Sequence, residues 1–125
     1  MLFDTDIMIW AQRKHGDAME LIGDAQIRYI SALSLMELFQ GARNRAELRI
    51  IKSFLSDADF QTLPLNEPIG HRALIYIEEY AHASGLRSAD AIIAATAVEN
   101  NLALVTGNKK HFKPIHDLKL MVFSP

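Results

Sequence analysis

Short apolar runs alternate with longer amphipathic stretches along the whole chain. The apolar runs predict strands at residues 1–3, 27–30, 60–65, 102–105 and 119–123. Apolar positions three and four residues apart predict helices at residues 7–14, 17–24, 31–43, 45–56, 69–84 and 88–101. Because short buried strands alternate with helices, we expect an α/β fold. The expected architecture is a three-layer sandwich, with a mainly parallel central sheet of about five strands flanked by helices.

Capping signals mark several of these boundaries. Asp6, Ser31 and Ser88 are placed to cap the helices that follow them. Gly85 is placed to end the helix at residues 69–84. Two prolines around an asparagine predict a loop at residues 64–68.

Length and composition narrow the class of protein. A chain of 125 residues predicts one domain over residues 1–125, and 50% hydrophobic with 22% charged residues is typical of a globular protein. The absence of cysteine excludes a disulfide framework, a thiol nucleophile and a cysteine–zinc site. The early acids Asp4 and Asp6 argue against a signal peptide, and no apolar run is long enough to span a bilayer. We therefore expect a soluble, cytoplasmic protein with no membrane partner.

Polar residues stand where two of the predicted strands end. Asp4 follows the first strand, and Thr106, Gly107 and Asn108 follow the fourth. Ligands of open α/β sheets bind outside the carboxyl ends of the strands, so the side chains of Asp4, Thr106 and Asn108 are candidates for a site. A turn residue or a helix cap is the alternative reading of Asp4, and a simple turn that of the other three.

Two further carboxylates lie in apolar helices. Glu37 interrupts the least polar helix start in the chain, with the small residue Ser34 on the same face. A glutamate that reaches solvent from the helix edge is the alternative. Asp90 lies in the first turn of the last predicted helix, where the helix dipole alone can account for an acid. Together with Asp4 they form an all-oxygen set, which suits Mg²⁺ or Mn²⁺ better than zinc.

At these residues the sequence resembles the PIN-domain family and, within it, the VapC-type toxins of toxin–antitoxin pairs. The resemblance rests on four blocks: LFDTDIMIW, SALSLMELFQGAR, LRSADAIIAATAVENNLALVTGN and KKHF. It implies a PIN-like fold and a ribonuclease that depends on Mg²⁺ or Mn²⁺. The metal ligands it implies are Asp4, Glu37 and Asp90.

The resemblance assigns roles to other positions as well. Thr106 matches the hydroxyl residue of the family, and Asp6 and Ser34 are expected to support the site. Many relatives carry a fourth acid where this chain has Asn108, so a second metal site is in question. With Thr106, Asn108 is expected to orient the attacking water. The resemblance further implies structured RNA, transfer RNA among the candidates, as substrate, an antitoxin of the VapB type as partner, and a homodimer.

Basic residues gather in two segments, residues 43–52 and 109–119. The second starts beside the expected site, so Lys109, Lys110 and Lys113 are candidate contacts for RNA phosphates. A net charge of −2 speaks against a broad basic surface that coats nucleic acid. Without the three expected metal ligands, however, 12 acidic residues remain against 13 basic ones, so a local contact with RNA is compatible with the charge.

Histidines show no spacing typical of metal ligands, and we interpret all five as surface or packing residues: His15, His71, His82, His111 and His116.

Two other functions remain open. The segment FDTDIMI also matches the DxD motif of haloacid-dehalogenase-like phosphatases, with Asp4 as nucleophile and Asp6 as acid. The chain is short for that fold, and Asp90 precedes Thr106, contrary to the order that it expects. A non-catalytic module that binds RNA or protein is the second alternative, and Asn108 in place of an acid favours it.

Overall fold

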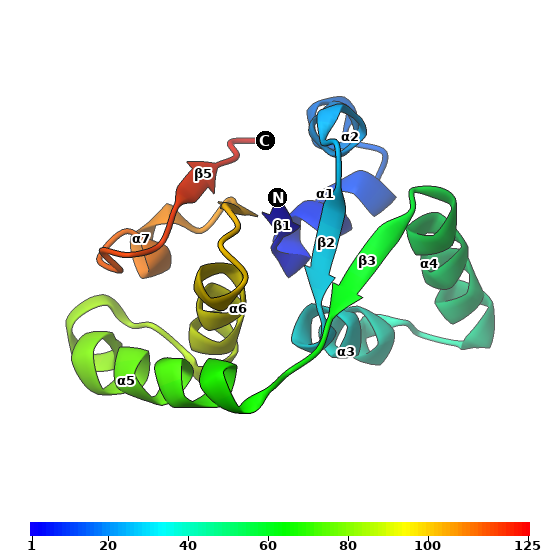
Figure 1. Cartoon of the computed structure of the whole chain (residues 1–125). Coiled ribbons are helices and arrows are strands. Elements are labelled where there is room, and N and C mark those ends of the chain that lie inside the picture. Colours follow the sequence, from blue (N-terminus) through cyan, green and yellow to red (C-terminus); the bar gives the residue numbers. More distant parts are fainter.

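The sheet forms the centre of the molecule. The computed structural model describes residues 1–125 and contains one sheet of five parallel strands in the order β3-β2-β1-β4-β5. The strands are β1 (Leu2–Phe3), β2 (Arg28–Ser31), β3 (Phe60–Leu63), β4 (Leu104–Thr106) and β5 (Leu120–Val122). The predicted α/β architecture with a parallel five-stranded sheet is confirmed (Figure 1).

Seven helices connect and cover the strands. They are α1 (Thr5–Gln12), α2 (Gly16–Asp24), α3 (Ala32–Gly41), α4 (Arg45–Asp57), α5 (Glu67–Ser84), α6 (Ser88–Glu99) and α7 (Lys109–Phe112). None of them is both long and apolar enough to cross a membrane.

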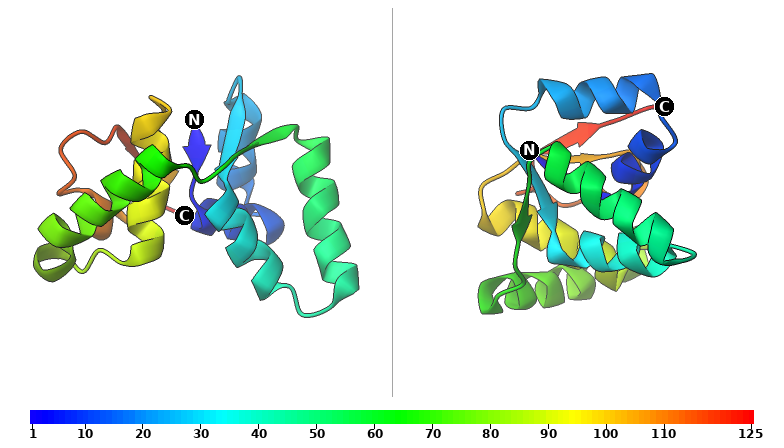
Figure 2. Two further views of the ribbon diagram at one scale, coloured as in Figure 1. Left: turned by 60° about the horizontal axis from the view of Figure 1, so that its bottom comes forward. Right: turned by 90° about the vertical axis from the view of Figure 1, so that its right-hand side faces the viewer.

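Alternation along the central strands sends side chains into two separate cores. Leu2 and Leu104 belong to the core that α5, α6 and α7 cover. Phe3 and Val105 belong to the core that α1 to α4 cover. Figure 2 shows the resulting layers, with α5 and α6 on one side of the strands and α4 on the other. Because β1 and β4 are buried on both faces, their residues are apolar up to Thr106, the last residue of β4.

Small residues let α6 lie close to its neighbours. Ala91, Ala94, Ala95 and Ala97 are fully buried in the core between α6, α5 and the sheet. The short alanine side chains permit this close approach. It also fixes the position of the first turn of α6, which carries Asp90.

Two of the expected caps are confirmed and two are wrong. Ser31 accepts a hydrogen bond from the backbone N–H of Leu33, and Gly85 ends α5 in the left-handed conformation at a φ of 75°. Asp6 lies inside α1, because Asp4 takes the capping position and accepts from Thr5 N. Ser88 is the first residue of α6, and the capping position belongs to Arg87.

The expected loop at residues 64–68 is shorter in the structure. Asn66 caps α5 by accepting from Ile69 N at 3.1 Å, so α5 begins at Glu67. Pro68 then lies in the first turn, where a proline sacrifices no hydrogen bond. The short helix α7, which follows the turn at Gly107, was not predicted from the sequence. Four residues are too few to show helical periodicity.

Candidate functional site

The candidate site lies where the chain reverses its direction of travel across the sheet. From β1 the chain proceeds to β2 and β3 on one side, and it then crosses to β4 and β5 on the other. A parallel sheet leaves a crevice at such a switch point, outside the carboxyl ends of the two strands. Asp4 directly follows β1, and Thr106 ends β4. The two residues expected to share an edge of the sheet therefore do so.

Asp4 is almost completely enclosed. Its side chain accepts one hydrogen bond from Thr5 N and one from Thr106 Oγ1, both at 2.7 Å, and the residue is only 7% exposed. Burial and then the negative charge of Asp6 raise the pKa of the Asp4 carboxyl to about 7, although the Thr106 hydrogen bond opposes the shift. In the absence of a cation, the raised pKa means that Asp4 binds a proton near neutral pH, which reduces the negative charge of this crevice.

Asp6 is the second acid of the crevice. Its Oδ2 accepts from Gly107 N at 2.8 Å, whereas its Oδ1 is buried and has no hydrogen-bond partner. A Cβ atom at Gly107 would lie 2.9 Å from Asp6 Oδ2, so only glycine lets the backbone approach the carboxylate in this way. Burial raises the pKa of Asp6, and the charge of Asp90 adds to the shift. Asp6 thus belongs to the acidic cluster itself.

Glu37 joins the cluster through a threonine. Thr5 Oγ1 lies 2.7 Å from Glu37 Oε1 and 2.9 Å from Ser34 Oγ. A hydroxyl has one proton, so Thr5 donates to the carboxylate, the stronger acceptor, and accepts from Ser34. Glu37 is exposed, which agrees with the alternative that it reaches solvent from its helix. Thr5 and Ser34 nevertheless hold its carboxylate beside the first turn of α1.

Asp90 contacts both its own helix start and the segment after β4. Its Oδ2 accepts from Arg87 N at 3.3 Å and lies 3.1 Å from His111 Nδ1. Asn108 Nδ2 lies 2.8 Å from the same ring nitrogen, and Asn108 N donates to Thr106 Oγ1. Asp90 thus takes part in the N-terminal cap of α6, where the sequence allowed only for an effect of the helix dipole, and this contact coexists with a place in the cluster.

The lysines expected to contact RNA lie on or beside α7. Lys109, Lys110 and Lys113 are all exposed. They follow Asn108 directly along the chain, so the short helix carries positive charge to the rim of the acidic crevice.

The chemistry of this crevice fits a divalent cation. The cluster offers carboxylate oxygens, one of them buried without a partner. Besides burial, the charges of Asp6 and Asp90 raise the pKa of Asp4, and the charge of Asp90 adds to the raised pKa of Asp6. As the side chains lie, no three acidic or histidine residues converge closely enough to hold one ion. The oxygen ligands for a cation are thus present. In this structure, however, the Glu37 and Asp4 carboxylates accept hydrogen bonds from Thr5 and Thr106 instead of converging on one point.

Sequence reasoning missed three residues of this site. Thr5 stands between two acids and belongs to no motif of its own, Gly107 is a residue typical of a simple turn, and His111 has no spacing typical of a metal ligand. The position of His111 three residues after Asn108, in a helix that starts there, was the one available signal, and it is visible only once α7 is known.

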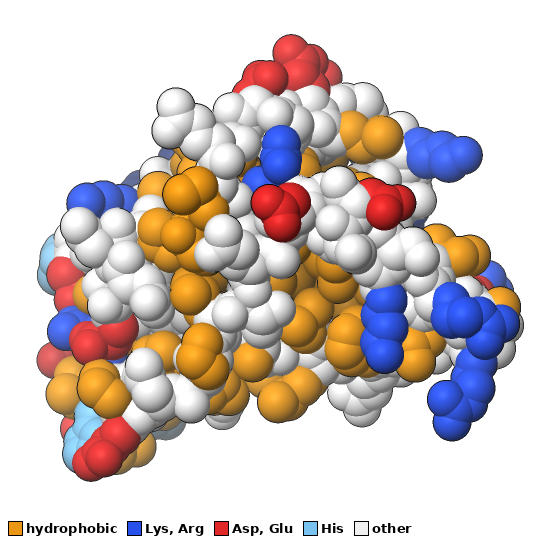
Figure 3. Space-filling view, turned by 45° about the vertical axis from the view of Figure 1, so that its right-hand side comes forward, with side chains coloured by type: hydrophobic (Ala, Val, Ile, Leu, Met, Phe, Trp, Pro, Cys, Tyr) orange, Lys and Arg blue, Asp and Glu red, His pale blue; other side chains and the backbone are white.

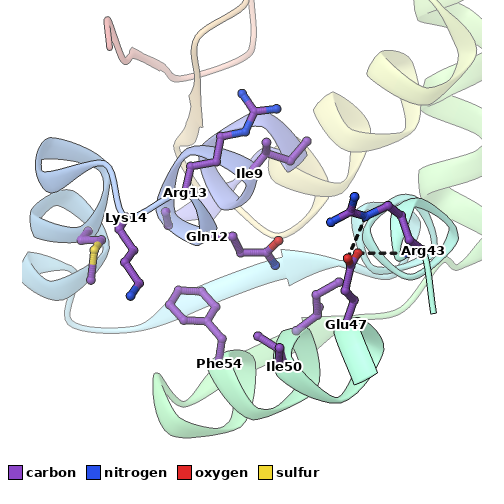
Figure 4. Close-up of a pocket in the computed structure, with 11 residues that line it drawn as sticks. Ile9, Gln12, Arg13, Lys14, Arg43, Glu47, Ile50 and Phe54 are labelled. Carbon is purple, nitrogen blue, oxygen red and sulfur yellow. Dashed lines mark hydrogen bonds and ion pairs between the residues drawn. The ribbon is translucent and has the colours of Figure 1, made fainter. Parts of the chain in front are cut away.

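A groove separates α1 and α2 from α4 on another face of the molecule. Its volume is about 590 Å³, and its lining includes Ile9, Met19, Ile50 and Phe54. Figure 4 shows Ile9 and Gln12 of α1 opposite Ile50 and Phe54 of α4. Arg13 and Lys14 border this apolar floor with positive charge, whereas Arg43, also in the lining, is paired with Glu47 at 2.8 Å. α1 joins the two features, because its first turn carries the acids and its last turn faces the groove.

Comparison with known proteins gives consistent results in sequence and in structure. The PIN-domain family model matches residues 1–116. The chain is 29% identical to a curated protein named Ribonuclease VapC2, from Rickettsia felis, and the match covers 95% of this chain and 94% of the relative.

Solved structures match over nearly the full length. A toxin–antitoxin complex from Klebsiella pneumoniae contains a chain with a TM-score of 0.82 and 29% identity, covering 97% of this chain and 95% of that one. VapBC2 from Rickettsia felis, bound to a DNA fragment from its promoter, has a TM-score of 0.82 and 26% identity, with 98% of each chain covered. The fold, the acids at the switch point and the family match agree with the resemblance drawn from the sequence motifs, and this chain belongs to the PIN-domain family.

Proposed function

We propose that this chain is a metal-dependent endoribonuclease and acts as the toxin of a toxin–antitoxin pair. The observation that carries the proposal is the cluster of Asp4, Asp6, Glu37 and Asp90 at the switch point of a PIN-domain fold. The similarity to a protein named Ribonuclease VapC2 supports RNA as the substrate. A toxin that cleaves cellular RNA acts in the cytoplasm, where we place this chain. Structured RNA, transfer RNA in particular, is the target class that we expect.

In this proposal Asp4, Glu37 and Asp90 hold Mg²⁺ or Mn²⁺, and Asp6 adds a further carboxylate. The bound cation supplies the positive charge that such sites use to polarise a phosphate and to make water a better nucleophile. It would also compensate the burial and the charge repulsion that raise the pKa of Asp4, because a cation reverses the local charge. Asp6 Oδ1 is the oxygen that lacks a protein partner and is therefore available to such an ion.

The remaining residues orient these acids and the substrate. Thr106 donates to Asp4 and accepts from Asn108 N, so one hydroxyl connects the two sides of the crevice. Thr5 holds Glu37. Lys109, Lys110 and Lys113 are exposed beside the crevice and would pair with phosphates that flank the scissile bond. The grip on RNA is then local, which agrees with the net charge of −2.

The direct test is incubation of the purified chain with total cellular RNA, with Mn²⁺, with Mg²⁺ and with EDTA. We expect discrete cleavage products in the presence of metal and none with EDTA. Mapping of RNA 5′ ends after brief induction in cells, against an Asp4→Asn control, would identify the target. RNA that stays intact with either metal would refute the proposal. Failure to bind Mn²⁺ at millimolar levels in calorimetry would instead favour a non-catalytic binding module.

We further propose that an antitoxin of the VapB type binds this chain. Two solved structures with at least 26% identity are described as a toxin–antitoxin complex and as VapBC2 bound to promoter DNA. The groove beside α1 supports such a partner, because Ile50 is 66% exposed and Met19 is 47% exposed. Figure 3 shows hydrophobic side chains at the surface on this side of the molecule, with Lys and Arg side chains at their edge. An acidic amphipathic segment complements that surface.

Replacing Ile50 with aspartate is expected to weaken this complex at least thirtyfold, because a central apolar contact of an interface contributes about 2 kcal/mol or more. Co-expression with the adjacent antitoxin gene, followed by co-purification and titration, measures the effect. Ile27→Asp is the matched control, since Ile27 is 48% exposed and does not line the groove. Equal losses for the two variants would exclude the groove as the binding surface.

A homodimer is the assembly that we expect for the chain. Exposed apolar side chains on α3 and α5 support it, with Leu74 at 63%, Met36 at 56% and Ile75 at 50% exposure. Apolar side chains that remain in water are unfavourable to the monomer. Their burial against each other across a twofold axis stabilises the dimer.

A further inference from the structure

His111 contacts two residues of the crevice through one ring nitrogen. His111 Nδ1 lies 3.1 Å from Asp90 Oδ2 and 2.8 Å from the side-chain amide of Asn108. The His111 side chain is 27% exposed and that of Asp90 is 18% exposed, so water competes little for this contact. The ring thus sits where α7 meets the start of α6.

The protonation of this nitrogen follows from its neighbours. A bare Nδ1 would direct its lone pair at the oxygen of the Asp90 carboxylate, which can only accept a hydrogen bond. A protonated Nδ1 donates to that oxygen, and the contact becomes favourable. The same proton then faces Asn108, whose side chain must offer Oδ1 rather than Nδ2. The nitrogen and oxygen of an amide are distinguished by such networks. In this network the side-chain oxygen of Asn108, rather than its nitrogen, faces His111 Nδ1.

With this assignment the ring fixes both neighbours. Asp90 Oδ2 accepts from Arg87 N and from His111 Nδ1, so Oδ1 is the oxygen left for a ligand. Asn108 is held through its backbone N–H by Thr106 and through its side-chain oxygen by the ring. Its amino group is then directed away from His111 and can donate to an anion. An acid at position 108 would instead compete with Asp90 for a single proton, which gives a physical reason for asparagine beside this histidine.

We propose that His111 is a positioning residue that, through Nδ1–H, holds Asp90 and Asn108 in the orientation that the metal site requires. The bond between the ring and the two side chains stands on geometry alone, whereas its effect on metal binding rests on the function proposed above. Outer partners of metal ligands typically contribute about 10- to 100-fold to metal affinity. His111 is the side chain in this structure that bridges two residues of the crevice from outside it.

The first measurement is the protonation pattern of the ring in the metal-free protein. Two-dimensional ¹H–¹⁵N spectra of the full chain at pH 8 in EDTA report which ring nitrogens carry protons. We expect Nδ1 to be protonated in His111. A bare Nδ1 would overturn the proposal, whatever the activity of the protein.

The second measurement is Mn²⁺ affinity by calorimetry for two amide variants. His111→Asn places an amide N–H where Nδ1 lies, whereas His111→Gln extends the amide to the position of Nε2. We expect His111→Gln to weaken Mn²⁺ binding about tenfold or more and His111→Asn to retain most of it. His71→Asn is the control, because His71 is exposed on α5 and pairs only with Glu67.

These outcomes separate the two proposals. Wild-type protein that binds Mn²⁺ and cleaves RNA, with both His111 variants unchanged or equally impaired, would overturn the role of His111 and leave the proposed function intact. Wild-type protein that neither binds Mn²⁺ nor cleaves RNA would overturn the proposed function and the metal-site role together. Circular dichroism of each variant confirms that the fold is retained.

Discussion

Replacing Asp4 with asparagine is expected to lower the rate of RNA cleavage at least about a thousandfold. Asp4 lies at the centre of the cluster, and the loss of a metal-binding carboxylate removes several kcal/mol of stabilisation from the transition state. Asparagine has nearly the same shape, so its amide oxygen accepts from Thr5 N and its amide N–H donates to Thr106 Oγ1, which itself donates to Asp4 in the wild type. The expected loss is therefore one of chemistry rather than of folding.

Single-turnover cleavage of a mapped RNA substrate at saturating Mn²⁺ measures this effect. Asp17→Asn is the matched control, because Asp17 is an exposed acid on α2 outside the crevice. Asp4→Asn with cleavage within tenfold of the wild type would remove Asp4 from the catalytic site. The same result would reopen the reading of the chain as a binding module.

The same substitution is expected to stabilise the metal-free protein at alkaline pH. The pKa of Asp4 is raised from 3.8 to about 7 in the folded chain, so between these values the folded state holds a proton that the unfolded state has released. Stability from this group is therefore greatest below about pH 4, falls as the pH rises towards 7, and stays low above it. The shift corresponds to a penalty on the order of 4 kcal/mol at pH 8. Asparagine carries no charge and avoids the penalty.

Urea unfolding in EDTA at pH 5 and pH 8 measures this difference. We expect the free energy of unfolding of the wild type to fall more than that of Asp4→Asn between the two pH values, and added Mn²⁺ to restore the wild type. If the free energies of unfolding of the two proteins changed equally with pH, the pKa of Asp4 would not be raised by folding. The two results together would define a residue that is costly to the fold and necessary to the site, a combination common where function opposes stability.

The hydrophobic pattern was sufficient to predict the layers of this fold because burial on both faces makes β1, and β4 up to Thr106, apolar. The ends of these two strands predicted that Asp4 and Thr106 lie together, since parallel strands end at the same edge of a sheet. The exact helix starts were less predictable: Asp4, Asp6, Arg87 and Ser88 are adjacent capping candidates, and tertiary contacts decide among them.

The parts of the site that escaped prediction depend on contacts between distant residues. His111 acquires its neighbours from α6 and from the turn after β4, and no local spacing announces that meeting. Gly107 resembles any turn glycine until Asp6, from the opposite end of the chain, is found against it. Glu37 is a third example. Its exposure depends on the orientation of α3, and its hydrogen bond comes from Thr5, which belongs to α1.

The hydrogen bond between Asp4 and Thr106 joins residues 102 positions apart. A second bond, from Gly107 N to Asp6, spans 101 positions. During translation the acids near the start of the chain are made first, but β4, the strand that completes their surroundings, is made 102 positions later, counted from Asp4 to Thr106. A ribosome that stalls or is released early therefore yields a fragment without an assembled site. For a protein whose proposed activity destroys RNA, this topology delays the hazard until β4 and the turn after it have been made.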